Sequence, residues 1–270
     1  AAKQMGYGWG FGVHEALDQL GALIGPLALA LILSLKHGDY KLAFASLAVP
    51  AVIMLSLLAL ARITYPRPQD LEPSTTPITT EGLPAVFWIY LAGAALAAAG
   101  FADFPLVAFH LERSATLSAA AVPVFYAIAM AVSGLGSLGF GRLFDRAGIG
   151  VLVPLTVLSA VYAPLAFFGR FWVALAGVAL WGLGMGVQES IVAAAVAPMV
   201  SPGRRSSAYG LFTSVYGITW FAGSVVIGAL YNVSFVALVA FCTAAELAAV
   251  PFIMVVRSRT AKRTDGVAEA

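Results

Sequence analysis

The sequence predicts an all-α polytopic membrane protein, a helical bundle of about eight transmembrane helices. Two observations support this class. Hydrophobic residues make up 61% of the 270 residues and charged residues only 10%, whereas soluble domains carry about 25% charged residues. The apolar residues also fall in runs of about 20, the length that crosses the hydrocarbon core of a bilayer. This composition therefore requires lipid as its solvent.

Eight such runs follow one another along the chain. Each is expected to be a helix, because lipid offers no hydrogen-bond partner to an open strand edge. Short breaks with turn or charged residues separate most of them. The expected spans are residues 12–35, 42–61, 84–109, 118–141, 149–169, 171–199, 207–231 and 234–256.

One break differs from the others in length and composition. Residues 62–84 hold five of the fourteen prolines together with Ser, Thr and three acids, which is typical of a linker. The sequence therefore predicts two helices within residues 1–65, a linker at 66–83, six helices within 84–257 and a basic tail at 258–270.

Lysine and arginine residues predict the orientation in the membrane. With a cytoplasmic N-terminus, eleven of the fifteen fall on the cytoplasmic side and four on the other side, namely Lys36, Lys41, Arg113 and Arg170. This bias follows the positive-inside rule, and eight crossings return the C-terminus to the cytoplasm. We therefore expect a multi-pass protein of the cell membrane with both ends of this chain cytoplasmic.

A charged segment, GFGRLFDRAG at 139–148, lies at an expected cytoplasmic turn between the fourth and fifth spans. It resembles the signature loop of the major facilitator superfamily of transporters, which joins the second and third helix of each six-helix half. Here the loop joins the second and third helix after the linker. Glycines let helices approach closely, the acid can satisfy a helix N-terminus, and the arginines hold the loop at the cytoplasmic face. The matching residues are Gly141, Arg142, Asp145, Arg146 and Gly148.

The first span carries a second resemblance. Gly21, Gly25 and Pro26 in GALIGP are similar to a G-x-x-x-G-P motif of the family's fifth helix, which is often found in antiporters. The two glycines are expected to offer a small-residue face to a neighbouring helix, and Pro26 is expected to bend the helix. An ordinary packing face with a proline kink is the alternative.

The sequence also contains an internal match. FGVHEALDQLGALIG at 11–25 aligns with YGLFTSVYGITWFAG at 209–223 at a constant offset of 198 residues. Equivalent helices of two homologous halves produce such a match. The resemblance makes these helices the fifth and the eleventh of twelve. The chain is then expected to be helices five to twelve of such a transporter, with a natural eight-helix protein as the alternative.

Acids, but no Lys or Arg, lie inside the expected spans. A charge at the bilayer centre costs at least ~2.5–3.5 kcal/mol, and a carboxyl without a basic partner lowers this cost by holding its proton. Protonatable acids that face a cavity suit a proton-coupled carrier, and they also suit a cationic substrate. The five acids are Glu15, Asp18, Asp103, Glu189 and Glu246.

Two helices supply the central candidates for a solute and proton path. Glu189 and the adjacent Gln188 lie near the middle of their span and are expected to line the path. His14 and Asp18 share one helix face with Gly21 and Gly25, and Asp18 is expected to face the cavity. Glu15 is expected to be structural.

Further candidates lie at the helix expected to break. Asp103 precedes Pro105, which favours a break or bend, and unwound backbone beside an acid suits a gate or a binding position. His110, seven residues on, is a candidate for proton coupling because histidine titrates near neutral pH. Glu246, in the last span, is expected to pack rather than to transport.

The sequence therefore predicts a secondary active transporter of a small organic solute, coupled to protons, that works by alternating access, with export favoured over import. Its expected partners are the solute, protons, membrane lipid and the missing N-terminal helices, with no nucleic acid. No cofactor, metal site or catalytic residue is expected, because the sequence has one cysteine and no phosphate-binding loop, zinc motif or nucleophile elbow. The alternatives are a membrane scaffold or solute receptor, and a polytopic enzyme that uses Asp103, Glu189 and His110 as acid and base.

Overall fold

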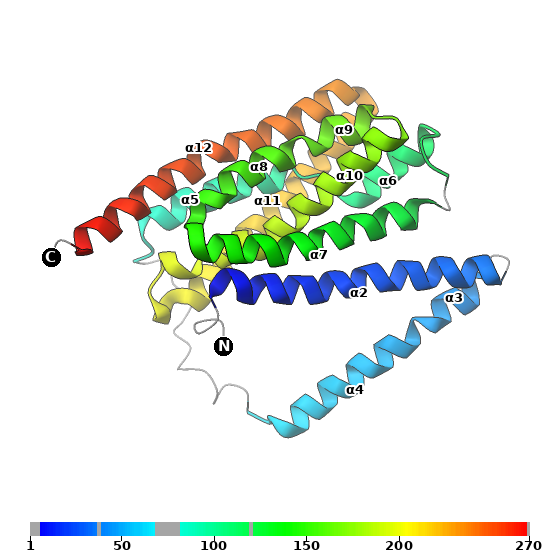
Figure 1. Ribbon diagram of the computed structural model, residues 1–270, viewed down its shortest axis with the longest axis horizontal. Helices are drawn as coiled ribbons and strands as arrows, with labels where there is room; N and C mark the ends of the chain where they lie inside the picture. Colours follow the sequence, from blue (N-terminus) through cyan, green and yellow to red (C-terminus); the bar gives the residue numbers. More distant parts are fainter. Residues whose placement is uncertain (1–5, 37–38, 68–81, 119–120, 269–270) are drawn as a thin grey trace.

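The computed structural model describes residues 6–36, 39–67, 82–118 and 121–268, and these ranges are all-helical (Figure 1). Most of the expected linker, at 68–81, lies outside them. The long helices are α2 (Tyr7–Leu35), α4 (Ala48–Thr64), α5 (Ala85–Gly100), α6 (Phe104–Arg113), α7 (Val122–Ala147), α10 (Phe171–Gly186), α11 (Arg205–Val233) and α12 (Phe235–Ala268). The shorter helical segments are α3 (Tyr40–Ser46), η3 (Gly148–Val151), α8 (Leu152–Ala160), α9 (Tyr162–Phe168), η4 (Val187–Val192), η5 (Ala197–Met199) and η6 (Pro202–Arg204).

Seven helical stretches of the described ranges are long and apolar enough to cross a membrane, which indicates a multi-pass membrane protein. One of them, Val122–Phe168, has 47 residues and would span ~70 Å if straight, about twice the hydrocarbon core. It reverses direction at Gly148, whose φ of 66° is one that glycine adopts without strain. The stretch therefore contains both the fourth and the fifth expected span.

Some boundaries differ from those expected. The second span is divided into α3 and α4, because Pro50 has no N–H to continue the helix through Ser46. The basic tail does not form a separate segment: α12 continues to Ala268, since residues 257–265 contain neither Gly nor Pro and include good helix formers.

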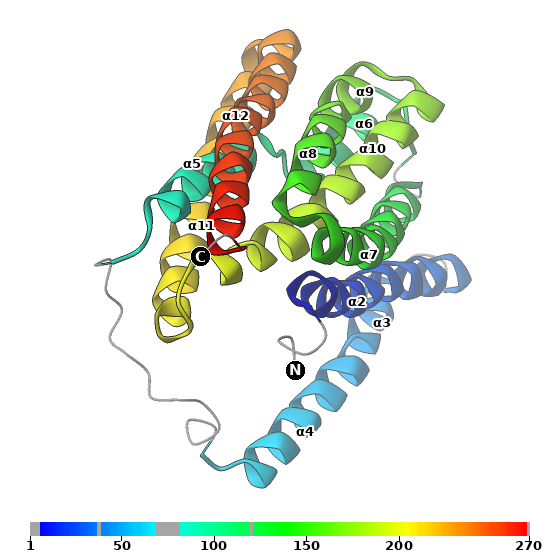
Figure 2. The same ribbon diagram turned by 60° about the vertical axis from the view of Figure 1, so that its left-hand side comes forward.

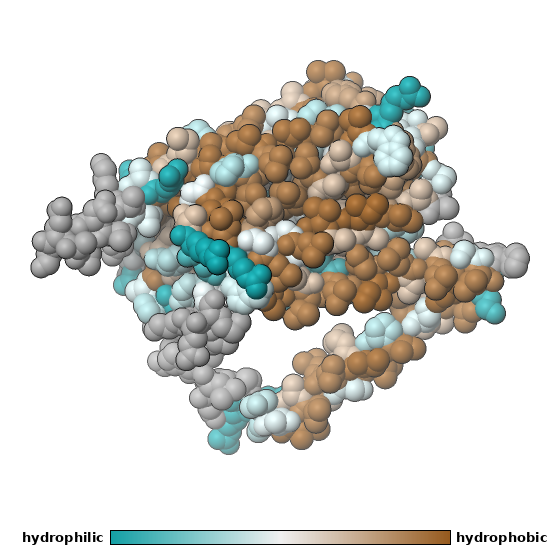
Figure 3. All heavy atoms as spheres, viewed as in Figure 1, coloured by the Kyte–Doolittle hydropathy of each residue, from teal (hydrophilic) through white to brown (hydrophobic). Residues whose placement is uncertain are grey.

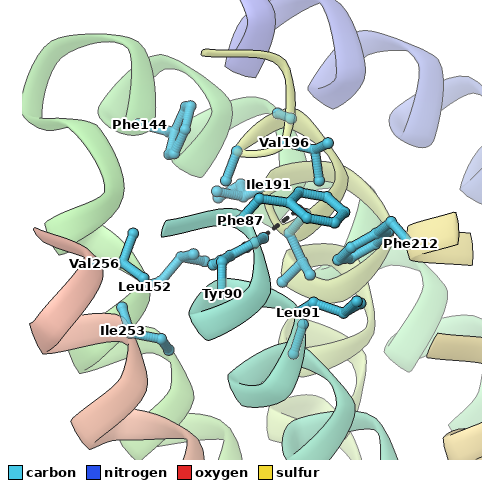
Figure 4. Close-up of a cluster of buried hydrophobic side chains, with 14 of the residues drawn as sticks. Phe87, Tyr90, Leu91, Phe144, Leu152, Ile191, Val196, Phe212, Ile253 and Val256 are labelled. Carbon is cyan, nitrogen blue, oxygen red and sulfur yellow. Dashed lines mark hydrogen bonds between the residues drawn. The ribbon is translucent and has the colours of Figure 1, made fainter. Parts of the chain in front are cut away.

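Two clusters of buried side chains hold the later helices together. In one of them, side chains of α5, α7, α8, η4, α11 and α12 converge (Figure 4), and the Tyr90 hydroxyl donates a 2.7 Å hydrogen bond to the Val192 carbonyl. The other surrounds Phe101, Tyr162 and Trp181. Because lipid is as apolar as these side chains, the clusters stabilise the bundle by close packing rather than by removing apolar surface from water.

Helix α2 lies along α7 in the opposite direction (Figures 1 and 2). Small residues allow this contact: a Cβ atom at Gly8 would overlap the Gly141 backbone, and one at Gly12 would overlap the backbone of Ser137. Helix α4, by contrast, projects away from the bundle (Figure 2) and has every residue from 48 to 64 exposed.

The molecular surface fits a protein that spans a bilayer. In Figure 3 the flank is hydrophobic over most of its length, and the hydrophilic groups gather toward the ends of the helices. Large apolar side chains of α4, such as Leu55 and Leu58, are more than half exposed. Such a surface requires lipid or further helices around it.

Candidate functional site

A cavity of about 590 Å³ lies between α2, α7, the α10–η4 stretch and α11, and we call it the central cavity. This volume falls within the range of ~300–1,000 Å³ that small-molecule sites occupy. One wall is polar and the opposite walls are largely aromatic. The polar side chains are His14, Glu15, Asp18, Gln19, Gln188 and Glu189. The aromatic ones are Phe11, Tyr126, Trp181, Phe212, Tyr216 and Trp220.

Two carboxyl groups meet across this cavity from different parts of the chain. The Gln19 amide nitrogen donates a hydrogen bond to Glu15 Oε1 within α2 and a second, of 3.1 Å, to Glu189 Oε2 on η4. Glu15 and Gln19 are each only 5% exposed. None of the described residues that line the cavity is Lys or Arg, and the lining histidine, His14, contacts Asp18 rather than this pair. We call Glu15, Gln19 and Glu189 the carboxyl cluster.

The local backbone of η4 brings Gln188 and Glu189 to this cavity. An unbroken α-helix was expected through residue 199, but Val187–Val192 forms a π-helix. The Ser190 hydroxyl donates to the Gly186 carbonyl. The Ser137 hydroxyl, on α7, shares its one proton between the Ser133 carbonyl at 2.7 Å and the Gly186 carbonyl at 3.3 Å. Such hydroxyl bonds compete with the helical ladder. π-Segments inside α-helices are frequent at functional sites.

Helices α2 and α11 line the cavity in equivalent ways. Each is 29 residues long. Their first residues are 198 positions apart in the sequence and so are their last residues, which is the offset that aligns the two sequences. Four positions of α2 that line the cavity have equivalents on α11 that also line it, namely His14 and Phe212, Glu15 and Thr213, Asp18 and Tyr216, and Ala22 and Trp220. A further equivalent pair, Phe11 and Tyr209, stacks directly with ring centroids 6.1 Å apart. The two helices therefore present equivalent positions to the cavity.

At one end of the bundle, the C-terminal turn of α7 contacts the N-terminal turn of α2. Asp145 accepts hydrogen bonds from the N–H groups of Gly8, at 2.8 Å, and Trp9, at 2.7 Å. These amides belong to the first turn, where they have no partner within the helix and carry the positive end of its dipole. The Arg142 guanidinium lies over the Trp9 ring, 3.7 Å from its centroid. We call these four residues the Asp145 clasp.

The other residues of the charged segment have separate places. Gly141 allows the close contact with Gly8, and Gly148 makes the reversal between α7 and η3. Arg146 is exposed in the last turn of α7. The prediction that the acid of this segment satisfies a helix N-terminus is confirmed.

Asp103 lies at the break between α5 and α6, as Pro105 predicts. Its carboxylate accepts hydrogen bonds from Trp220 Nε1 at 2.8 Å and from Ser224 Oγ at 2.6 Å, both on α11. Trp220 lines the central cavity, whereas Asp103 itself is not among the lining residues. Asp103 therefore fixes α11 against the break and reaches the cavity only through Trp220.

His110 lies away from the central cavity and is 8% exposed. Its Nε2 is 2.9 Å from the Phe167 carbonyl oxygen, which can only accept, so Nε2 carries the proton. Its Nδ1 is 3.3 Å from the Tyr231 hydroxyl. These bonds join α6 to α9 and α11, and they do not bring His110 to the carboxyl cluster.

Part of α2 differs from the sequence prediction. A Cβ atom at Gly21 or Gly25 would meet nothing within 4 Å, so the expected packing face has no partner among the described residues, and α2 continues through Pro26. Asp18 lines the cavity and contacts His14 at 3.4 Å, with both side chains exposed. The prediction missed Glu15 and Gln19, although their spacing of four residues places them on one helix face.

No family model matches the chain. It is 38% identical over 263 residues to uncharacterized proteins of Mycobacterium tuberculosis and Mycobacterium bovis. Each match covers 95% of this chain and 64% of the relative, so the chain spans just under two thirds of the length of these relatives. Their names carry no activity.

Proposed function

We propose that this chain is part of a secondary active transporter of the major facilitator type, which exchanges a small organic cation for protons. The central cavity with its carboxyl cluster is the observation that carries the proposal. A site of this volume, bounded by aromatic rings and acids, suits a small solute, and it lies between helices that the sequence repeat relates.

The lining of the cavity favours a positively charged solute. Carboxyl groups from α2 and η4 face a site whose described lining residues include no Lys or Arg, and aromatic faces attract organic cations. A cation and a proton then compete for Glu189 and Glu15, because each neutralises the same pair. Competition of this kind favours exchange in opposite directions, and the proton gradient of a cell favours export.

The equivalence of α2 and α11 supports alternating access. In transporters with parallel repeats, the solute site lies between the two halves, which rock about it. The stacked pair of Phe11 and Tyr209 joins α2 to α11 on one side of the cavity, and the Asp145 clasp holds α2 to α7. We infer that this end faces the cytoplasm, since Arg142, Arg146, Arg204 and Arg205 gather there.

The open face of α2 supports further helices in the same protein. Gly223 of α11 packs so closely on α5 that a Cβ atom would overlap the backbone of Ala99, whereas its equivalent on α2, Gly25, has nothing within 4 Å. By the same equivalence, a helix related to α5 covers Gly25. The relatives are long enough to supply such helices.

A flux measurement tests the proposal. The full-length protein in liposomes with an imposed proton gradient is expected to accumulate tetraphenylphosphonium or another lipophilic cation in exchange for protons. Glu189→Gln removes one of the two carboxyl groups of the cluster but keeps its shape, so we expect loss of proton-driven exchange. Glu112→Gln, at an exposed position on α6, is the matched control and should keep full activity.

Unchanged proton-driven flux in Glu189→Gln would refute the role of the carboxyl cluster. Saturable binding of cations without any flux in the wild-type protein would instead favour a solute receptor.

A further inference from the structure

A second, much smaller cavity lies beside Glu246 on α12. Its volume is about 20 Å³, and one water molecule needs at least ~10–15 Å³ by this kind of measure. The polar residues that line it come from three elements: Thr156 and Ser159 from α8, Gln188 from η4 and Glu246 from α12. We call it the Glu246 cavity.

Two polar atoms at this cavity have no hydrogen-bond partner among the residues that the structure describes. Glu246 is 1% exposed and its Oε1 is unpaired, while Ser159 is 3% exposed and its Oγ is unpaired. Buried polar atoms are almost always paired with protein or with an ordered water. A water that bridges these two atoms would satisfy both, and a buried water typically has two to four such partners.

The described residues around Glu246 carry no positive charge. The titratable groups that face it are all hydroxyls or a thiol: Tyr90 from α5, Tyr162 from α9, Tyr216 from α11 and Cys242 from α12 itself. None of the described residues that line the cavity is Lys, Arg, His or Asp. The nearest cation along α12, Arg257, lies three turns away beside Gly150.

Gln188 connects this cavity to the central one. Its side chain is 7% exposed and lines both cavities. Its Oε1 accepts a hydrogen bond from Tyr216, which lines the central cavity. The adjacent Glu189 belongs to the carboxyl cluster. Gln188 is therefore a polar side chain that the two cavities share.

We propose that the Glu246 cavity binds one water molecule between Ser159 and Glu246, and that this pair is a second proton-binding site communicating with the carboxyl cluster through Gln188. Binding of the water and of the proton does not depend on transport activity. A role of this site in proton coupling rests on the proposed function. The sequence pattern pointed to a packing role for Glu246, since it lies on the last helix.

Infrared difference spectroscopy of the purified protein between acidic and alkaline pH tests the site directly. A protonated carboxyl has its own C=O stretching band. We expect Glu246→Gln to remove one such band, and Ser159→Ala to shift that band because the water loses one partner. Glu112→Gln, an exposed glutamate, should leave it unchanged. Transfer of the protein into D2O shifts the band as deuterium replaces the carboxyl proton, and Gln188→Leu should slow this exchange.

The outcomes separate the two proposals. A Glu246→Gln spectrum identical to the wild type at every pH would show that Glu246 is ionised and would overturn the site. If Glu246→Gln does not fold, an unshifted carboxyl spectrum in Ser159→Ala overturns it instead. The expected band changes in a protein without cation flux would support the site and refute transport. Flux whose pH dependence is the same in Glu246→Gln and wild type would refute the coupling role.

Discussion

Acidic side chains within the helices are energetically costly in a membrane, and different contacts hold them in position. Glu15 and Glu189 share the Gln19 amide, Asp103 is held by Trp220 and Ser224, and Asp145 caps a helix. Of these acids only Glu15 and Glu189 line the central cavity, which Asp18 lines as well. The shared Gln19 amide is the contact through which the two carboxyls lie together, at a site whose described lining residues include no Lys or Arg.

The Asp145 clasp can be tested by stability. Asp145→Ala leaves the Gly8 and Trp9 amides without their acceptor, and loss of a helix cap costs about 0.5–2 kcal/mol. We expect a lower midpoint of thermal unfolding in detergent. Asp39→Ala removes the cap of α3, a helix of only seven residues, and should change the midpoint less. An Asp145→Ala protein as stable as the wild type would contradict the capping role.

Sequence reasoning at this scale found Glu189, Gln188, Asp18 and His14, which line the cavity, and the capping role of Asp145. It missed Glu15 because its nearness to the helix start favoured a structural role. Contact with Glu189 depends on how α2 lies against η4, and no local pattern reports that arrangement.

Among the elements, three departures from regular α-helix define the site. The break at residues 101–103 follows from Pro105 and was predicted. The reversal at Gly148 was predicted as a turn. The π-segment η4 was not predicted, because the Ser137 hydroxyl that bonds the Gly186 carbonyl comes from a distant helix. Regular helices therefore follow from sequence periodicity, while this irregular one requires tertiary contacts.

The contact between α2 and α7 offers an element-scale prediction. Gly12→Leu places a side chain where α7 backbone lies, so we expect loss of the folded, monodisperse protein in size-exclusion chromatography. Gly139→Leu, on α7 at a position where a Cβ would meet nothing within 4 Å, is the matched control and should be tolerated. Equal behaviour of the two variants would show that α2 does not pack here.

At the scale of the whole molecule, the main observation is the offset of 198 residues that relates α2 to α11. Three positions of sequence similarity suggested it, and the equal length and equal cavity positions of α2 and α11 extend it. The sequence could predict the class and the number of crossings from apolar run lengths. It could not predict that α4 and part of α2 lie exposed among the described residues, because run length does not report which helices pack together.

The equivalence of α2 and α11 makes a prediction that the described contacts alone do not. In the full-length protein, Gly25→Leu should lower thermal stability about as much as Gly223→Leu, although only Gly223 touches another described helix. Gly217→Leu, on α11 where a Cβ meets nothing within 4 Å, should be neutral. A neutral Gly25→Leu would mean that no helix equivalent to α5 covers α2.

The most direct test of the central claim is whether α2 and α11 must separate for transport. Phe11→Cys with Tyr209→Cys allows a cleavable thiol cross-linker to join the stacked pair, and the one native cysteine, Cys242, is buried. In liposomes, cross-linking is expected to abolish proton-driven cation flux, and cleavage of the linker to restore it. Flux that continues at the uncross-linked rate in fully cross-linked protein would contradict alternating access about this cavity.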